Sequence, residues 1–349
     1  MNKEELSKIA KQMVAEGKGI LAADESMNTV GKRFAAINLE NTEDNRRAFR
    51  EMLLTAPGEG EYVSGVILFD ETIRQKTSSG KSFVEVLNSE GILPGIKVDQ
   101  GLVEVGESGE KITKGLDGLA ERLKEYSALG AKFCKWRSVI TIGEGTPTEE
   151  NIRQNAKDLA SYALECQKAN LVPMVEPEVL LEGSHSIEQA KDASGRILTA
   201  LFEELNKAGV LLEGLILKTS MVLPGKNYTA KASPEEIAKE TIEVFARVLP
   251  NNLAGVVFLS GGQGEIEATE NLNAINSSGK QPWSLTFSYA RALQDGATKA
   301  WSGEQENMEI AQKTFMHRAK MNSLASLGKY SKEMEEGFAS STGGEVTQD

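Results

Sequence analysis

The feature that most constrains this chain is a regular alternation of short apolar runs with longer amphipathic stretches. Eight runs of strand length occur along the sequence, at residues 19–26, 63–70, 95–99, 132–140, 171–179, 212–220, 254–262 and 283–289. Continuous apolar runs are typical of parallel strands that are covered on both faces. Strands that alternate with helices predict parallel β/α units, and about eight such units predict an α/β fold of the (β/α)8 TIM barrel type.

The stretches between these runs carry helix signals. Apolar residues recur at helical spacing over residues 116–129, and Ser233 with Pro234 provides an N-cap and a first helical residue for another helix. Residues 1–17 and 303–328 predict extra helices outside the barrel units. A doubly wound sheet is disfavoured, because its first strand would be followed by a glycine-rich turn, which this chain lacks.

The domain organisation follows from the absence of a linker. No stretch rich in Pro, Gly or Ser divides the 349 residues, so we predict that residues 1–338 form a single barrel domain. Residues 339–349 are small and polar, and they predict a flexible C-terminal tail.

Composition argues against several classes of partner. The net charge is −12, which disfavours a nucleic-acid surface and docking on anionic membranes. No apolar run approaches the ~18 residues of a membrane span, and residues 1–12 have neither signal-peptide nor transit-peptide character. We therefore predict a cytoplasmic protein that has no nucleic-acid or membrane partner.

Cysteine and histidine content bears on cofactors. Cys134 and Cys166, the two cysteines, make no disulfide framework and suit a reducing cytosol. The two histidines, His185 and His317, are far apart in sequence and have no metal-ligand spacing around them. We expect no metal and no cofactor, although these arguments leave a carboxylate-bound Mg²⁺ open.

Polar side chains stand at or just beyond the ends of nearly all the apolar runs. In chain order they are Asp24, Asp70, Lys97, Asp99, Lys135, Arg137, Glu176, Glu178, Lys218, Ser260, Ser288 and Arg291. A barrel gathers the carboxyl ends of its strands at one face, where catalytic groups lie. One lysine at a strand end is explained by simple exposure to solvent. Polar groups at nearly every end predict a site.

The residue types at this predicted site indicate amine chemistry. It has three lysines and several carboxylates, and neither histidine belongs to it. A lysine near another ammonium group in a partly desolvated pocket has a lowered pKa, so that its neutral amine can attack a carbonyl and form a Schiff base. A carboxylic acid must then move protons as water leaves the carbinolamine.

A second motif points to phosphate. The run that ends in "FLSGGQGE" at residues 258–265 places small residues between a strand and a predicted helix. Exposed backbone N–H groups at such a turn can hold a phosphate group, and Arg291 could complete the site with a forked contact. Taken alone, the turn is equally consistent with an ordinary tight turn.

With these residues, the chain resembles the class I fructose-1,6-bisphosphate aldolases, the Schiff-base type that needs no metal. The motifs that carry the resemblance run from Gly19 to Tyr330 and include "GILAADES", "KWRSVI", "VPMVEPEVL", "LEGLILKTSM", "FLSGGQ" and "LTFSYARALQ". The resemblance implies reversible cleavage of fructose 1,6-bisphosphate to dihydroxyacetone phosphate and glyceraldehyde 3-phosphate. This reaction belongs to glycolysis and gluconeogenesis, and a role in the Calvin cycle stays open. The family also implies a homo-oligomer, a tetramer.

The resemblance implies a role for each catalytic residue. Lys218 matches the Schiff-base lysine, and Lys135 matches the neighbouring lysine that biases the amine and helps in cleavage. Glu176 matches the general acid and base of imine formation. Asp24 matches the carboxylate that takes the proton of the C4 hydroxyl. Glu178 matches a glutamate that tunes both lysines.

The resemblance also implies a set of groups that bind the substrate. Those around the 1-phosphate are Ser260, Gly261, Gly262 and Arg291, and those around the 6-phosphate are Ser26, Arg33 and Lys97. We expect Arg137 to support the 6-phosphate pocket and Ser288 to belong to the phosphate-binding set.

The chain departs from the family pattern at a few positions. Thr219 and Ser220 stand where animal members have Pro and Asn, and Ala290 replaces a usual glycine. The chain ends at Asp349 without the terminal tyrosine of animal members, so we expect the tail to be dispensable for cleavage. Two rivals stay open, namely another Schiff-base lyase or transaldolase and a non-catalytic aldolase-like binding protein. Activity on fructose 1-phosphate or sedoheptulose 1,7-bisphosphate also stays open.

Overall fold

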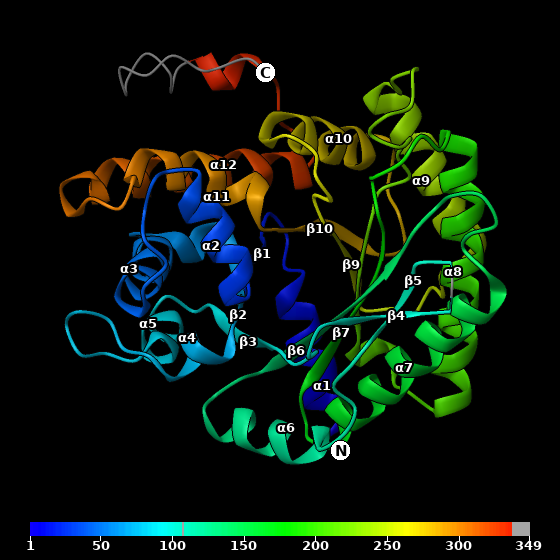
Figure 1. Cartoon of the computed structure of the whole chain (residues 1–349), viewed down its shortest axis with the longest axis horizontal. Coiled ribbons are helices and arrows are strands. Elements are labelled where there is room, and N and C mark those ends of the chain that lie inside the picture. The colour runs from blue at the N-terminus through cyan, green and yellow to red at the C-terminus, as the bar shows by residue number, and fades with distance from the viewer. Residues whose placement is uncertain (107, 337–349) are drawn as a thin grey trace.

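Eight parallel strands close into a barrel in the computed structural model, which describes residues 1–106 and 108–336 (Figure 1). The order around the barrel is β1-β10-β9-β8-β7-β6-β3-β2. The strands are β1 (Gly19–Ala23), β2 (Val63–Leu68), β3 (Leu93–Lys97), β6 (Phe133–Ile140), β7 (Val172–Val179), β8 (Ile216–Thr219), β9 (Gly255–Phe258) and β10 (Ser284–Tyr289). Each predicted run contributes one strand, so the predicted TIM barrel is confirmed.

Helices surround the barrel (Figure 1). They are α1 (Lys3–Met13), α2 (Met27–Ala35), α3 (Glu43–Leu54), α4 (Asp70–Arg74), α5 (Phe83–Ser89), α6 (Leu119–Ala128), α7 (Glu149–Lys168), α8 (Ile187–Ala208), α9 (Pro234–Val248), α10 (Glu265–Ser277), α11 (Arg291–Trp301) and α12 (Met308–Ser326). Short 3-10 helices occur at Glu59–Glu61, Leu212–Gly214 and Gln305–Asn307. The predicted N-cap is present, since Ser233 Oγ accepts a hydrogen bond from the backbone N–H of Glu236.

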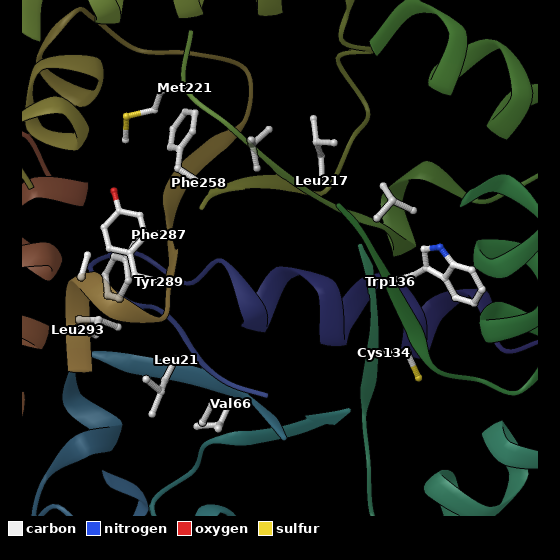
Figure 2. Close-up of a cluster of buried hydrophobic side chains, with 14 of the residues drawn as sticks. Leu21, Val66, Cys134, Trp136, Leu217, Met221, Phe258, Phe287, Tyr289 and Leu293 are labelled. Carbon is white, nitrogen blue, oxygen red and sulfur yellow. The ribbon is translucent and has the colours of Figure 1, made fainter. Parts of the chain in front are cut away.

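The two faces of each strand have different surroundings. Side chains that alternate along a strand point to opposite faces. Ile20, Phe133, Met174 and Ile216 belong to a cluster inside the barrel, against which α1 packs. The alternate side chains, such as Trp136, face the helices in the larger outer core, part of which Figure 2 shows. This alternation turns the charged side chains near the strand ends toward the inside of the barrel mouth, the face where the strands end.

One element was not predicted. An antiparallel hairpin of β4 (Leu102–Val105) and β5 (Glu110–Thr113) is inserted between β3 and α6. Glu110 accepts hydrogen bonds from the backbone N–H and the hydroxyl of Thr148, both at 2.8 Å. Thr113 Oγ1 donates to the carbonyl oxygen of Arg137, also at 2.8 Å. The hairpin is thereby fixed against β6 and the start of α7.

One of the polar strand ends does not belong to the site. Asp70 begins α4, and its Oδ1 accepts hydrogen bonds from Arg74 and from the hydroxyl of Tyr126. The predicted tail at residues 339–349, and the domain boundary before it, lie outside the described residues. Within the described part of the chain, no helix has the length and apolar character needed to cross a membrane.

Candidate active site

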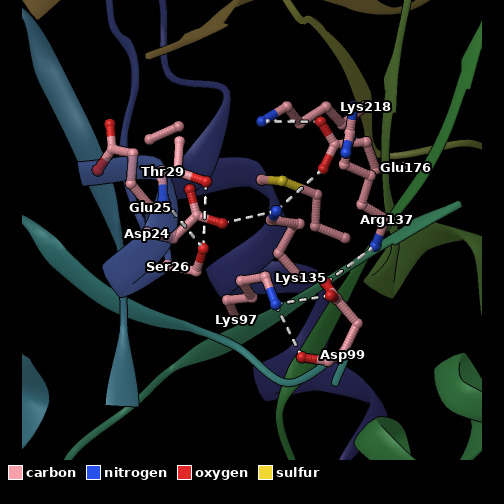
Figure 3. A network of polar contacts seen from close by, with 12 residues as sticks. Asp24, Glu25, Ser26, Thr29, Lys97, Asp99, Lys135, Arg137, Glu176 and Lys218 are labelled. Atoms are coloured by element: carbon pink, nitrogen blue, oxygen red, sulfur yellow. Dashed lines mark hydrogen bonds and ion pairs between the residues drawn. The ribbon is translucent and has the colours of Figure 1, made fainter. Parts of the chain in front are cut away.

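The centre of the site is a buried ion-pair network at the barrel mouth (Figure 3). Lys135 is the third residue of β6, and its Nζ is 2.6 Å from Asp24 Oδ2 and 3.2 Å from Glu176 Oε2. Asp24 follows β1 and Glu176 lies on β7. Since β6 and β7 are neighbours in the sheet whereas β1 is not, the network joins opposite parts of the barrel wall.

The second lysine shares a carboxylate with the first. Lys218 on β8 places its Nζ 3.1 Å from Glu176 Oε1, so Glu176 bridges the two ammonium groups. Only 4% of Lys218 is exposed, which excludes the interpretation of a strand-end lysine that extends into solvent. Burial of two cations is tolerable here because carboxylates pair with them.

The charges within the network determine which protons stay in place. Burial alone would raise the pKa of Asp24, but the charges of Lys135 and Lys218 outweigh it and lower the pKa to about 2. Burial likewise opposes the shift of Glu176, whose pKa falls because of Lys135 and Lys218. Burial alone would lower the pKa of Lys135, but the charges of Asp24 and Glu176 outweigh burial and raise it. The resting site therefore holds two carboxylates and a firmly protonated Lys135.

Lys97 and Arg137 are held at the same mouth by carboxylates. Lys97 Nζ lies 2.6 Å from Asp99 Oδ1, and Asp99 Oδ2 accepts a hydrogen bond from the backbone N–H of Arg137. The guanidinium of Arg137 pairs with Glu178. Glu178 was expected to tune the two central lysines, yet the ion pair that the structure gives it is to Arg137.

The turn after β9 brings together the residues that were predicted to bind the 1-phosphate. Ser260 is buried, and Gly261 and Gly262 have φ angles of +61° and +107°, a backbone region that favours glycine. A Cβ atom added to Gly262 would lie 3.6 Å from Nη2 of Arg291, the first residue of α11. Ser288 on β10 has a buried hydroxyl without a hydrogen-bond partner among the described residues.

The remaining predicted phosphate ligands lie on α2 or at its start. Ser26 is the N-cap of α2, and its hydroxyl lies 3.1 Å from that of Thr29. Arg33 comes from the last turn of α2 and pairs with Glu25 at 2.7 Å. Figure 3 shows Ser26 beside Asp24, which follows the same strand.

The described residues offer no cluster of side chains that could bind a metal. Among residues 1–106 and 108–336, no cluster of three or more His, Cys, Asp or Glu side chains has the geometry to bind one. His185 is buried, and His317 contacts Glu335 at 2.7 Å. Cys134 and Cys166 are both buried and free.

A family comparison identifies this arrangement. The family model described as "Fructose-bisphosphate aldolase class-I" matches residues 5–345. The chain belongs to the class-I fructose-bisphosphate aldolase family.

Relatives in several kingdoms resemble this family member along most of its length. Cytosolic fructose-bisphosphate aldolase 4 of Arabidopsis thaliana is 55% identical over 93% of this chain and 83% of its own length. Fructose-bisphosphate aldolase of Dictyostelium discoideum is 51% identical over 97% and 96%. A solved Plasmodium falciparum fructose-bisphosphate aldolase, in complex with TRAP and a small-molecule inhibitor, is 49% identical. It superposes with a TM-score of 0.93 over 94% of this chain and 96% of that chain.

Sequence reasoning missed two buried groups beside the aldolase site. Glu25 points away from Asp24 and pairs with both Arg33 and Arg50. Gln294 contacts Arg33 from α11. The one available signal was the position of Glu25 directly after Asp24, because alternation along an extended segment turns two consecutive carboxylates to opposite faces.

Proposed function

We propose that this aldolase cleaves fructose 1,6-bisphosphate through a Schiff base on Lys218. The relatives are named for fructose-bisphosphate cleavage, and reversible formation of dihydroxyacetone phosphate and glyceraldehyde 3-phosphate is the reaction of this chain as well. The observation that carries the choice of nucleophile is the bridge that Glu176 makes between two buried lysines. A carboxylate between two amines can accept a proton from one of them while the other stays charged.

The contacts of the two lysines favour Lys218 as the nucleophile. Lys135 pairs with two carboxylates, which raise its pKa and hold it as a cation. Lys218 pairs with Glu176. Its proton can pass to that carboxylate at 3.1 Å, and Lys135 remains as a fixed positive charge that stabilises negative charge as it develops.

Imine formation follows from this geometry. Glu176 takes a proton from the Lys218 ammonium, and the neutral amine adds to the C2 carbonyl of the open-chain sugar. A proton of the attacking nitrogen moves to the C2 oxygen, which becomes the hydroxyl of a neutral carbinolamine. Glu176 then returns its proton to this hydroxyl, water leaves, and a protonated imine forms between Lys218 and C2.

Cleavage uses the carboxylate on the opposite wall. Asp24, with a pKa of about 2, is ionised at neutral pH and takes the proton of the C4 hydroxyl. The C4–O bond becomes the aldehyde of glyceraldehyde 3-phosphate, and the electron pair of the C3–C4 bond moves into the imine to give an enamine. Protonation of the enamine at C3 and hydrolysis of the imine release dihydroxyacetone phosphate and regenerate Lys218.

The substrate is held by its two phosphate groups. We assign the 1-phosphate to the turn formed by Ser260, Gly261 and Gly262 together with Arg291, because that turn exposes backbone N–H groups near a guanidinium. We assign the 6-phosphate to Ser26, Arg33 and Lys97, with support from Arg137, and we place Ser288 in the phosphate-binding set. A requirement for both phosphates separates this function from a transaldolase that acts on a singly phosphorylated sugar.

Borohydride trapping tests the proposal. Reduction in the presence of dihydroxyacetone phosphate should inactivate the enzyme, and peptide mapping should find the label on Lys218. A label on Lys135 or Lys97 would overturn the assignment. Activity should also survive prolonged EDTA treatment, and a loss that Zn²⁺ restores would contradict a Schiff-base mechanism.

Two properties of the whole enzyme complete the proposal. We infer a cytosolic enzyme, because several relatives are named as cytosolic or cytoplasmic isozymes. We also infer a homo-oligomer, a tetramer, from the family resemblance, which sedimentation velocity can test directly. Neither a nucleic acid nor a membrane is part of the proposed function.

A further inference from the structure

Gln294 is a fully buried amide that joins three elements at the barrel mouth. It lies in the first turn of α11, three residues after Arg291. Its Nε2 donates a 2.7 Å hydrogen bond to the carbonyl oxygen of Ala22 on β1, and its Oε1 accepts a hydrogen bond from Nη1 of Arg33 on α2. One side chain thus connects the strand that leads to Asp24, the helix that carries Arg33, and the helix that begins with Arg291.

The chemistry of both partners fixes the orientation of this amide. The carbonyl of Ala22 can only accept a hydrogen bond, and the guanidinium of Arg33 can only donate one. A side chain between them must therefore present a donor to one and an acceptor to the other. Neither an apolar residue nor an ionised carboxylate satisfies both partners.

The contact with β1 lies where the backbone ladder stops. Strands β1 and β10 pair in parallel, Ile20 with Ser288 and Leu21 with Tyr289. Gln294 supplies a donor to the next residue, Ala22, and so fastens β1 to α11 beyond the last strand pair. This bond keeps the side chain of Gln294, and with it the acceptor Oε1 that faces Arg33, in a fixed position against β1.

The contact with Arg33 completes a cradle around its guanidinium. Glu25 Oε1 pairs with Nη1 of Arg33 at 2.7 Å, and Gln294 Oε1 accepts a hydrogen bond from the same nitrogen. The side chain of Arg33 is 13% exposed, so part of it still faces solvent. Gln294 lies in the first turn of α11, which begins at Arg291, so the guanidinium of Arg33 contacts the N-terminal turn of that helix.

We propose that Gln294 is a positioning residue for substrate binding, which holds the guanidinium of Arg33 in the direction of the 6-phosphate group. This inference rests on the proposed function, because it takes the assignment of Arg33 from there. Gln294 touches neither the reacting carbons nor Lys218 in this scheme. It acts through Arg33, and its removal should impair binding of the bisphosphate more than the chemical step.

The test is a Gln294→Leu variant of the full chain, measured on two substrates. The KM for fructose 1,6-bisphosphate should rise roughly tenfold, the effect of weakening one charged hydrogen bond, while kcat is largely retained. The KM for fructose 1-phosphate should stay unchanged, because that sugar lacks the 6-phosphate. If Gln294→Leu does not fold, Gln294→Met, which keeps the length and flexibility of the side chain, is measured in its place with the same expectations.

Gln167→Leu provides a matched control. Gln167 is also fully buried, and its amide bonds the backbone of Leu211 and Gly214 before β8, at the end of the barrel away from the mouth. The Gln167→Leu substitution should lower the melting temperature and leave both KM values unchanged. If Gln294→Leu behaves in the same way, with lower stability and no change in KM, the inference is overturned.

A double substitution separates this inference from the assignment on which it rests. Arg33→Ala alone should raise the KM for the bisphosphate, and adding Gln294→Leu to it should produce no further rise. A further tenfold rise in the double variant would show that Gln294 acts independently of Arg33 and would overturn the inference. A wild-type KM in Arg33→Ala would instead place the error in the assignment of Arg33 to the 6-phosphate.

Discussion

Asp24 and Lys135 form a 2.6 Å ion pair across the barrel mouth, between a residue that follows β1 and one on β6 (Figure 3). These strands are separated in the barrel by β2 and β3 on one side and by four strands on the other. The pair therefore forms only because the barrel closes. It places the carboxylate of Asp24 on one side of Lys135 and the carboxylate of Glu176, which also contacts Lys218, on the other.

This relationship predicts that Asp24→Asn separates cleavage from imine formation. The amide keeps the shape of the side chain but cannot take the C4 hydroxyl proton, so cleavage of the bisphosphate should slow by roughly 10²–10⁴-fold. Borohydride trapping with dihydroxyacetone phosphate should continue, because Lys218 and Glu176 remain. Steady-state rates and trapping rates measure the two steps, and equal losses in both would contradict this division of roles.

The two central lysines should respond differently to the same substitution. Lys218→Met should fold, lose turnover and lose borohydride labelling, because the covalent electron sink is gone. Lys135→Met should also lose turnover, since Asp24 and Glu176 lose their shared cation, but label should still reach Lys218. Mass spectrometry of the reduced proteins distinguishes the variants. A labelled Lys218→Met protein would place the nucleophile elsewhere.

Arg291→Ala tests the phosphate cradle. Loss of a guanidinium that bonds a phosphate should weaken binding by roughly 1.5–3 kcal/mol, and it should do so for fructose 1,6-bisphosphate and fructose 1-phosphate alike. Isothermal titration with a non-cleavable bisphosphate analogue and KM measurements on both sugars provide the readout. Arg153→Ala, which removes the same charge from an exposed position on α7, is the control and should leave both unchanged. Wild-type affinities in Arg291→Ala would place this residue outside the cradle.

The barrel could be predicted because each of its strands has a local sequence pattern. The β4–β5 hairpin also has a local pattern, but it was not predicted. Each strand is a continuous apolar run, and alternation fixes which residues point inward, so Lys135, Glu176 and Lys218 could be placed together from sequence. The pattern "LVEV" at residues 102–105, followed by glycines, is itself typical of a hairpin. Its strands are short and half polar, so they do not form a continuous apolar run like those of the barrel strands.

Other parts of the site depend on contacts that no local pattern contains. Arg33 and Gln294 are 261 positions apart, and only the closure of the barrel brings their helices together. The ion-pair partner of Glu178 likewise depends on tertiary contacts. Strand alternation correctly places Glu176 and Glu178 on one face, but the residue opposite each depends on the register between β6 and β7. That register, together with the side-chain conformations, lets Glu178 form its ion pair with Arg137.

The last prediction concerns a carboxylate outside the site. Glu335 follows α12 and accepts hydrogen bonds from Arg318 at 2.6 Å and from the hydroxyl of Tyr330 at 3.0 Å, and it contacts His317 at 2.7 Å. Burial opposes the shift, but His317 and Arg318 lower the pKa of Glu335 to about 2. The carboxylate thus ties the segment after Tyr330 to α12.

A lowered folded-state pKa fixes the sign of the pH effect. The unfolded chain binds its proton near pH 4.3, so the stability from Glu335 is fully present above that value and is lost as the pH falls toward about 2. At pH 7, Glu335→Gln should lower the free energy of unfolding by roughly 1.5–3 kcal/mol, and this difference from wild type should shrink below about pH 4.3. Urea unfolding at a series of pH values measures it. Cleavage kinetics at pH 7 should not change, and a stability difference that is constant down to pH 3 would show that the charge of Glu335 does not matter.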